Sequence, residues 1–139
     1  MTERYVLDAC ALLALLNNEK GADVVADVIN AANNDKTSIS MHKANLLEVY
    51  YDVFRSVSKS KADEVFGEIK NSPVNVISEI SDAVFEEAGR LKALHKISFA
   101  DTFALATASV NNATLLTADH HEMDKVKMIE KDFKFLWIR

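Results

Sequence analysis

Cysteine, proline and glycine are scarce in this chain of 139 residues, which contains one cysteine, one proline and three glycines. The single cysteine, Cys10, excludes an internal disulfide framework and is typical of a protein from a reducing compartment. So few glycines and prolines exclude a turn-rich β-sandwich or a flexible linker, and we expect helices to dominate. With no internal repeat or low-complexity segment, the length predicts one domain over residues 1–139.

A basic surface is also lacking, because 21 acidic residues outweigh 16 basic ones and the net charge is −5. This balance excludes affinity for nucleic acid through a generally basic surface, although an enzyme that approaches phosphate through bound metal ions stays compatible with it. No apolar run approaches the roughly 18 residues of a membrane span. The apolar stretch Ala9–Leu16 has no cationic leader, unlike a signal peptide. We therefore expect no membrane association and a cytoplasmic location.

The chain does contain short strand-like segments that alternate with segments of helical periodicity. Apolar residues recur at helical spacing in residues 25–32, 47–57, 62–69 and 84–91, and residues 99–110 form a nearly apolar helix. Strands separated by helices need crossover connections, so we expect a three-layer α/β/α domain with a mainly parallel sheet. Five segments are predicted to be strands: Tyr5–Leu7, Thr37–Ser40, Val74–Ile77, Thr114–Thr117 and Phe133–Ile138.

Four carboxylates lie beside these apolar segments. Asp8 ends the first predicted strand, Asp119 follows the fourth, Glu48 lies within a helical stripe and Asp101 lies in the first turn of the apolar helix. Ligands of such sheets bind beyond the carboxyl ends of the strands. Carboxylates gathered there without cationic partners repel one another and gain raised pKa values. A hard divalent cation such as Mg²⁺ or Mn²⁺ is the common way to make such a cluster favourable.

Each acid also has a purely structural interpretation. Asp8 and Asp119 could cap the helices that follow them, and Asp101 is the last residue of a capping-box pattern that begins at Ser98. Glu48 could be a solvated residue at the margin of its stripe. Taken singly, each structural role is the better explanation. The recurrence of all four acids at topologically meaningful places favours a site.

The pattern as a whole resembles the PIN-domain nucleases. Four segments carry the resemblance in the family's order: Tyr5–Leu16 is similar to the opening of the domain, Asn45–Tyr50 to the central glutamate helix, Ser98–Ala108 to the third acidic motif and Leu115–Asp119 to the fourth. The resemblance rests on the ordered set rather than on any one motif, and it extends along the whole chain.

The resemblance implies a five-stranded parallel sheet in the order 3-2-1-4-5 and a ribonuclease that depends on Mg²⁺ or Mn²⁺. It implies that Asp8, Glu48, Asp101 and Asp119 are the catalytic and metal-binding residues. Thr117 is expected to orient a water or the phosphate, with a turn hydrogen bond as its alternative role. The size of the chain resembles that of VapC-type toxins of prokaryotic toxin–antitoxin pairs, which implies an RNA substrate, a homodimer and a small antitoxin partner.

The sequence departs from the family pattern just after the fourth motif, where the family often has an acid followed by a phenylalanine. This chain continues with His120, His121, Glu122, Met123 and Asp124. We therefore prefer Asp119 as the fourth acid and keep Glu122 and Asp124 as alternatives. The adjacent histidines suggest zinc, but neighbouring side chains on a helix point about 100° apart, and no cysteine lies nearby to complete a zinc site.

Two other functions stay open from the sequence. One is a catalytically inactive PIN-like interaction module; the other is a metal-dependent phosphatase, which is disfavoured because the segment Asp8–Cys10 lacks a second acid. For partner binding or self-association, the apolar stripes at residues 25–32 and 62–69 are the candidates, with core packing as their alternative role. His42 and His95 are expected to be surface or helix-end residues rather than catalytic bases.

Overall fold

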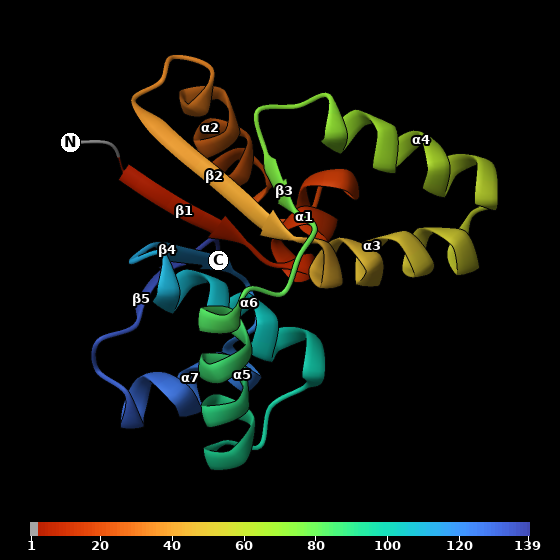
Figure 1. The fold of residues 1–139 in the computed structure, drawn as a ribbon. Coiled ribbons are helices and arrows are strands. Elements are labelled where there is room, and N and C mark those ends of the chain that lie inside the picture. The colour runs from red at the N-terminus through yellow and green to blue at the C-terminus, as the bar shows by residue number, and fades with distance from the viewer. Residues whose placement is uncertain (1–2) are drawn as a thin grey trace.

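Five strands form a single parallel sheet in the order β3-β2-β1-β4-β5 (Figure 1). This computed structural model describes residues 3–139. The strand order confirms the predicted one, and all strand pairs are parallel. The strand bounds differ from the predicted ones by at most two residues at either end: β1 Glu3–Leu7, β2 Thr37–His42, β3 Asn75–Ile77, β4 Thr114–Thr117 and β5 Lys134–Trp137.

Helices fill the connections between the strands, and two helices separate β2 from β3 and β3 from β4, as predicted. None of the helices within residues 3–139 is long and apolar enough to cross a membrane. Their bounds are α1 Ala9–Leu16, α2 Ala22–Ala32, α3 Lys43–Ser56, α4 Lys59–Lys70, α5 Asp82–Leu94, α6 Phe99–Val110 and α7 His120–Ile129.

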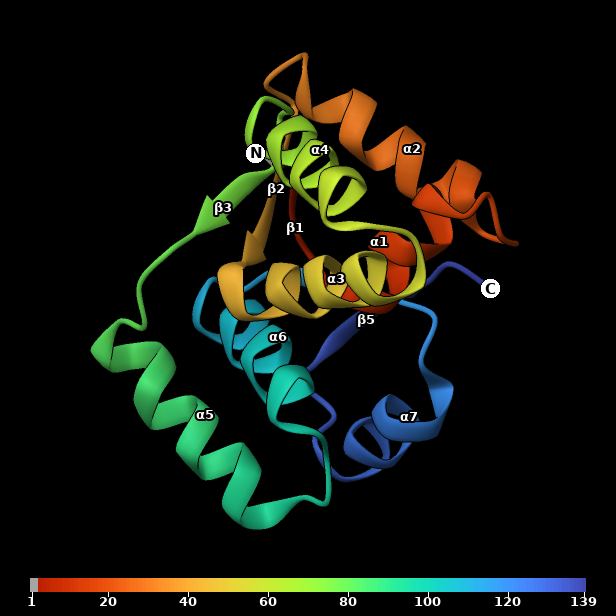
Figure 2. The ribbon, with the colours of Figure 1, turned by 90° about the vertical axis from the view of Figure 1, so that its right-hand side faces the viewer.

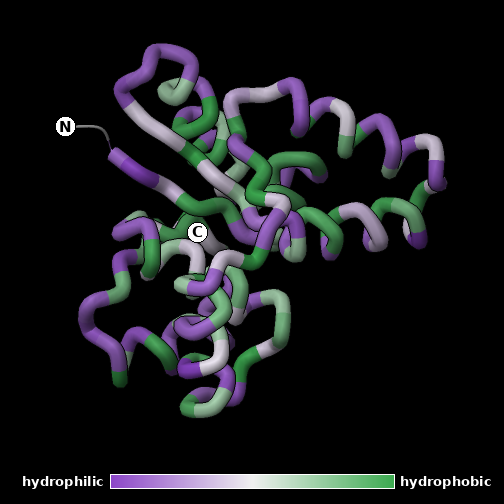
Figure 3. The backbone as a smooth tube through the Cα atoms, viewed as in Figure 1, coloured by the Kyte–Doolittle hydropathy of each residue, from purple (hydrophilic) through white to green (hydrophobic). Residues whose placement is uncertain are grey.

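The two faces of the sheet are covered by separate hydrophobic cores. Successive residues of a strand point to opposite faces, so Leu7 and Leu116 pack with α1–α4, whereas Val6 and Leu115 pack with α5, α6 and α7. All four side chains are fully buried. β1 is exposed at its start and buried at its end, and Figure 3 shows that its residues change from hydrophilic to hydrophobic in the same direction. Strands buried on both faces are typical of parallel sheets.

The apolar stripes of α2 and α4 pack in or against the first of these cores, so of the two roles left open by the sequence the structure shows core packing. Val25 on α2, and Ala62 and Val65 on α4, are fully or almost fully buried. The large apolar side chains that remain exposed lie on and next to α3, around α5 and α6, and at the end of α7: Leu47, Tyr51, Phe54, Val57, Ile80, Phe85, Leu94, Phe99, Val110, Met128 and Ile129.

The carboxyl ends of β1 and β4 lie side by side at the centre of the sheet, since Leu7 pairs in register with Leu116. The chain runs from β1 to one edge and from β4 to the other, so this is the point at which the strand order reverses. Figure 2 shows α1, α3 and α6 gathered at this end of the strands. The topology therefore brings the loops after β1 and β4 together with α3 and α6.

Candidate active site

A cavity of about 400 Å³ lies beyond the carboxyl ends of β1 and β4 and is lined mainly by polar side chains. Asp52 lines it as a pair with Arg55, and four further acids line it as well: Glu48 from α3, Asp101 from α6, Asp119 from the loop after β4, and Glu122 from α7. All four are partly buried. A fifth acid of this group, Asp8, directly precedes the lining residues Ala9 and Cys10. Five carboxylates from distant parts of the sequence therefore surround or adjoin one cavity.

Asp8 is both the N-cap of α1 and a buried carboxylate, with an exposed fraction of 1%. Its Oδ1 accepts a hydrogen bond of 2.8 Å from the N–H of Ala11, while its Oδ2 is buried without a hydrogen-bond partner. Burial raises the pKa of Asp8 to about 7 and outweighs the lowering by the Thr117 hydroxyl and the Ala11 N–H; the charges of Asp101 and Asp119 raise it further. The capping role thus uses one oxygen and leaves the other free.

Asp101 lies in the first turn of α6, where Ser98 is the N-cap. The Ser98 hydroxyl accepts a hydrogen bond of 3.1 Å from the N–H of Asp101, so half of the predicted capping box is formed by Ser98. Burial raises the pKa of Asp101 to about 6. The Ser98 hydroxyl lowers this pKa, while the negative charges of Asp119, Glu48 and Glu122 raise it. The Asp101 carboxylate is therefore close enough to three other acids of the cavity for their negative charges to raise its pKa.

Glu48 and Asp119 complete the set of predicted acids. Burial raises the pKa of Glu48, and the charges of Asp119 and Asp52 add to the effect. Asp119 is the N-cap of α7, because its Oδ1 accepts a hydrogen bond of 3.2 Å from the N–H of Glu122. Like Asp8, it caps a helix and lies at the cavity at the same time.

Thr117 is completely buried at the end of β4. Its hydroxyl oxygen accepts a hydrogen bond of 3.0 Å from the N–H of Asp119 and also acts on the pKa of Asp8. These contacts correspond to the turn role that the sequence left as the alternative. Through these contacts Thr117 holds the segment of Asp119 in place beside Asp8.

No cation neutralises this acidic group. In the part of the chain that the structure describes, none of the five acids forms a salt bridge. Arg55 lines the cavity but pairs with Asp52 at 2.8 Å, and Arg139 pairs with Glu19 at 3.0 Å. Burial and the nearby acids also raise the pKa of the Cys10 thiol to about 11. This thiol is therefore protonated at neutral pH and is a poor nucleophile.

The donors fit a hard divalent cation in their chemistry, since Mg²⁺ and Mn²⁺ prefer carboxylate oxygens. The buried Oδ2 of Asp8 and the buried Oε2 of Glu122 both lack hydrogen-bond partners, which is costly unless a ligand satisfies them. Across residues 3–139, however, no three His, Cys, Asp or Glu side chains already converge on one point as metal ligands do. Binding would therefore require rotation of acid side chains into the cavity.

Residues 5–128 of the chain match the family model of the PIN domain. The chain belongs to the PIN domain family. This match covers all four predicted acids and both strands at the centre of the sheet. No curated protein matches the chain in sequence.

Solved structures share this PIN fold at low sequence identity. VapBC2 from Rickettsia felis, solved bound to a DNA fragment from its promoter, has 18% identity and a TM-score of 0.74, over 96% of this chain and 97% of that one. VapBC-1 from nontypeable Haemophilus influenzae has 18% identity and a TM-score of 0.73, over 97% and 98%. VapC20 from Mycobacterium tuberculosis, a toxin that cleaves the sarcin–ricin loop, has 15% identity and a TM-score of 0.63, over 87% and 94%.

Within this PIN domain, the structure distinguishes Glu122 from Asp124, the two alternatives to Asp119 as the fourth acid. Glu122 faces the cavity, and its Oε2 is buried. Asp124 is exposed and lies 3.2 Å from the ring of His120. Two residues along α7 correspond to a rotation of about 200°, so the two acids point in nearly opposite directions. Glu122 can join Asp119 at the cavity, whereas Asp124 lies outside it.

Asn45 contributes to the site of this PIN domain, although the sequence analysis did not single it out. It is fully buried on α3, and its Nδ2 donates a hydrogen bond of 2.8 Å to the carbonyl oxygen of Ala100 on α6. Glu48 follows Asn45 by one helical turn, and Asp101 follows Ala100 directly, so this bond fixes two acid-bearing segments relative to each other. A polar residue among the apolar positions of a helix was the available signal.

The other two histidines of this PIN domain are at helix ends, as expected, but neither is on the surface. His42 is the N-cap of α3 and is buried against the ring of Phe103. His95 is the C-cap of α5, and its almost fully buried ring contacts Glu130. Both are held by neighbours within the fold, and neither lines the acidic cavity.

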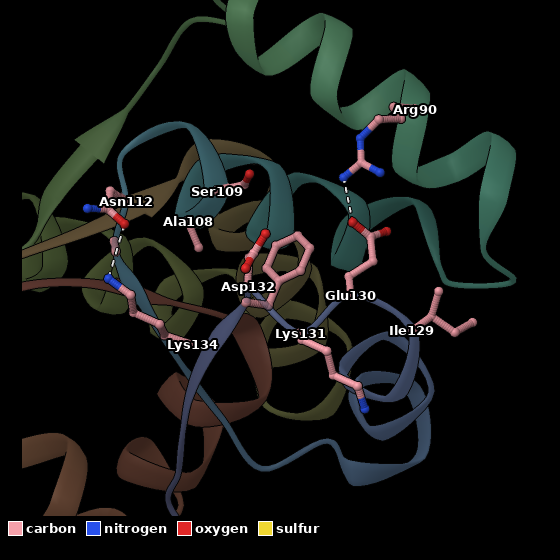
Figure 4. Close-up of a pocket in the computed structure, with 11 residues that line it drawn as sticks. Arg90, Ala108, Ser109, Asn112, Ile129, Glu130, Lys131, Asp132 and Lys134 are labelled. Atoms are coloured by element: carbon pink, nitrogen blue, oxygen red, sulfur yellow. Dashed lines mark hydrogen bonds and ion pairs between the residues drawn. The ribbon is translucent and has the colours of Figure 1, made fainter.

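A second cavity, of about 430 Å³, lies near the amino ends of β4 and β5, away from the acids (Figure 4). Two of its charged side chains, Arg90 and Lys134, are bonded to other residues of its lining. Arg90 bonds to Glu130 at 2.7 Å, and Lys134 bonds to Asn112 at 3.1 Å. These internal pairs satisfy the groups and connect α5 to the end of α7, so a structural role explains them.

Proposed function

We propose that this PIN-domain protein is a ribonuclease that hydrolyses RNA phosphodiester bonds with Mg²⁺ or Mn²⁺, and that it is the toxin of a prokaryotic type II toxin–antitoxin pair acting in the cytoplasm. One observation carries the proposal: within residues 3–139, the five acids Asp8, Glu48, Asp101, Asp119 and Glu122 meet at or beside one cavity and form no salt bridge, and two of their oxygens are buried and unbonded. A folded protein gains from such a group when a cation binds to it.

Asp8, Glu48, Asp101 and Asp119 are the residues that would hold the cation, with Glu122 as a further donor. A divalent cation bound there supplies neutralisation of the phosphate charge and a lower pKa for the attacking water. The fold's own contribution is positioning. Asp8 and Asp119 are held by the helices that they cap. Raised pKa values mean that the acids lose protons when a cation binds, so affinity should rise with pH between about 5 and 8.

A small antitoxin and a second copy of the chain are the proposed protein partners. The support is that the solved structures with this fold include toxin–antitoxin assemblies, among them VapBC2 and VapBC-1. The exposed apolar side chains on α3 and around α5 and α6 leave surface that a partner chain could cover. Co-expression with the protein encoded by a neighbouring short reading frame, followed by size-exclusion chromatography with light scattering, tests both partners. Elution as a monomer without a bound protein would contradict them.

A cleavage assay on a mixed RNA pool tests the nuclease proposal. The wild-type chain should cleave with Mg²⁺ or Mn²⁺ and stop in EDTA. The Asp101→Asn variant should be inactive, while Asp124→Asn, which changes an exposed acid outside the cavity, should cleave like the wild type. Activity that persists in EDTA, or in a folded Asp101→Asn protein, would contradict the proposed mechanism.

An interaction module without catalysis is the second candidate, and one observation favours it. An enzyme with a rigid metal centre would have at least three ligands that converge on one point before the metal binds. Within residues 3–139 no such group is present. Titration calorimetry with Mn²⁺ separates the two functions. Heat of binding in the wild type that is lost in Asp8→Asn supports the nuclease, and no heat at millimolar Mn²⁺ supports the inactive module.

A further inference from the structure

The histidine pair that follows Asp119 is not used by the proposed metal site, yet the ring of His120 is held by three contacts. It stacks on the indole of Trp137 with the ring centroids 4.0 Å apart and the planes at 16°. Its Nδ1 lies 3.2 Å from a carboxylate oxygen of Asp124, and its Nε2 lies 2.9 Å from the carbonyl oxygen of Arg139. One contact covers a face of the ring and the other two engage its edge. The ring is therefore fixed in position and orientation.

The His120 ring is only partly covered by these contacts. The side chain keeps 48% of its exposure in spite of these contacts. Trp137 covers one face and both nitrogens are engaged at the edge. Within residues 3–139 no second ring stacks on His120, so its second face is left for a further stacking contact. His121, by contrast, is exposed and has no stacking or hydrogen-bond contact within residues 3–139.

The stack continues from His120 into the sheet. Trp137 also stacks on Phe135, with centroids 5.1 Å apart and planes at 15°. Phe135 and Trp137 are two residues apart on β5, so their side chains lie on the same face of the strand. Trp137 pairs in register with Thr117, and Asp119 at the cavity directly precedes His120. Three aromatic rings are thus in successive contact, and the outermost, His120, is one residue from Asp119, on the side of α7 that carries Asp124.

We propose that the second face of His120 is a stacking platform for one unpaired nucleobase of a single-stranded RNA whose backbone also reaches the acidic cavity. This inference rests on the proposed ribonuclease function. Every base has a planar face, and stacking on aromatic rings is a common mode of single-strand recognition. Because the ring is already fixed, its ordering costs little on binding.

A contact with the face of a base adds affinity that does not depend on a generally basic surface. With a net charge of −5, the protein lacks the general attraction that basic proteins have for RNA. The one cationic residue that lines the cavity, Arg55, is paired with Asp52. Stacking is independent of phosphate charge, so it can supply affinity where electrostatics cannot. It also selects unpaired bases, since bases within a duplex are already stacked.

Fluorescence anisotropy with a labelled, mixed-sequence 2′-O-methyl RNA of about ten nucleotides, a length typical of such sites, tests the platform in the presence of Mg²⁺, because this RNA resists cleavage. His120→Ala should weaken binding about tenfold. His120→Phe, which keeps a ring but no nitrogens, should bind within about twofold of the wild type. His121→Ala is the matched control and should bind unchanged. Equal binding by all variants overturns the proposal, as does equal loss in His120→Ala and His120→Phe.

A change in the RNA gives a readout that a merely structural role of His120 would not move. One abasic position should weaken binding to the wild type by about the same factor as His120→Ala, and it should have little further effect on that variant. Additive losses overturn the platform. The two proposals fail separately: RNA cleavage with an unchanged KM in His120→Ala removes the platform and keeps the nuclease. If the wild type binds RNA by stacking but does not cleave it with metal, the nuclease proposal fails and the stacking platform stands.

Discussion

Replacing Asp8 with asparagine separates the electrostatic cost of the acidic cavity from its structural role. Asparagine is about the same size and is as good an N-cap as aspartate, so the hydrogen bond from the N–H of Ala11 should survive. The negative charge is lost. We expect the metal-free Asp8→Asn protein to be more stable than the wild type at pH 8, although the position is buried at the end of a core strand.

The size of the effect follows from the pKa of Asp8, which burial raises from 3.8 to about 7. A difference of about three pKa units corresponds to about 4 kcal/mol at 1.36 kcal/mol per unit. The asparagine amide would replace the unbonded Oδ2 and leave a buried donor without a partner, which costs about 1–3 kcal/mol. The net gain at pH 8 is therefore about 2 kcal/mol, or a rise in Tm of about 6 °C for a chain of this size.

The sign of the pH dependence is also determined. When the pKa of an acid is higher in the folded state, the unfolded chain loses this proton at a lower pH than the folded protein does. Between the unfolded-state and the folded-state pKa, the folded protein therefore binds more protons. The wild type should therefore lose stability as the pH rises from about 4 to about 7, while the variant has no such loss at this position. At pH 5 most of the advantage should vanish.

Urea unfolding in EDTA at pH 5 and pH 8 measures the difference. Asp27→Asn, a change of an exposed acid on α2, is the control and should have no pH-dependent effect. Millimolar Mn²⁺ should reverse the order by stabilising the wild type alone. The reasoning is refuted if metal-free Asp8→Asn is less stable than the wild type at pH 8, or if the difference between them is the same at both pH values.

Three further changes test individual residues of the site. Asp101→Asn should abolish Mn²⁺ binding in calorimetry without loss of apo stability, because one like charge leaves the cavity; a destabilised apo variant that still binds Mn²⁺ would contradict its role. Glu122→Gln should lower RNA cleavage while Asp124→Asn does not, since only Glu122 faces the cavity; the opposite order would exchange their roles. Asn45→Ala should cost about 1–3 kcal/mol in urea unfolding and slow cleavage about tenfold or more, because α3 and α6 lose a buried bond. Asn111→Ala, which removes a bond of the same length to a carbonyl at the far end of α6, should leave cleavage unchanged; an equal loss there would show that Asn45 has no special part in positioning.

Local patterns in the sequence were enough to predict the elements and their order. β4 was predicted at Thr114–Thr117 and α6 at residues 99–110, the bounds that the structure shows. Both have strong signals within a few residues: a short apolar strand bounded by polar residues, and a serine N-cap before an apolar run. The strand order came from the family resemblance, which rests on the order of four motifs rather than on any one of them.

The interior side of each helix was decided only by tertiary packing. The stripes of α2 and α4 were open to two interpretations, because an amphipathic stripe looks the same whether the core or a partner covers it. The fold places Val25, Ala62 and Val65 in the core and leaves Leu47 and Phe85 exposed. Helical periodicity identifies a face; it does not identify what lies against that face.

Some features of the site follow from the local sequence, and others depend on contacts between distant segments. The sequence by itself determined which acids follow strands or begin helices, since Asp8 and Asp119 are capping residues whose signals lie within three positions. Contacts between distant segments decided the rest. Asn45 meets Ala100 at a separation of 55 residues, and His120 meets Arg139 at a separation of 19. Burial, which raises the pKa of Asp8, is likewise a property of the surrounding chain. No local pattern encodes such pairs, because they form only when crossover connections bring the carboxyl ends of the strands together.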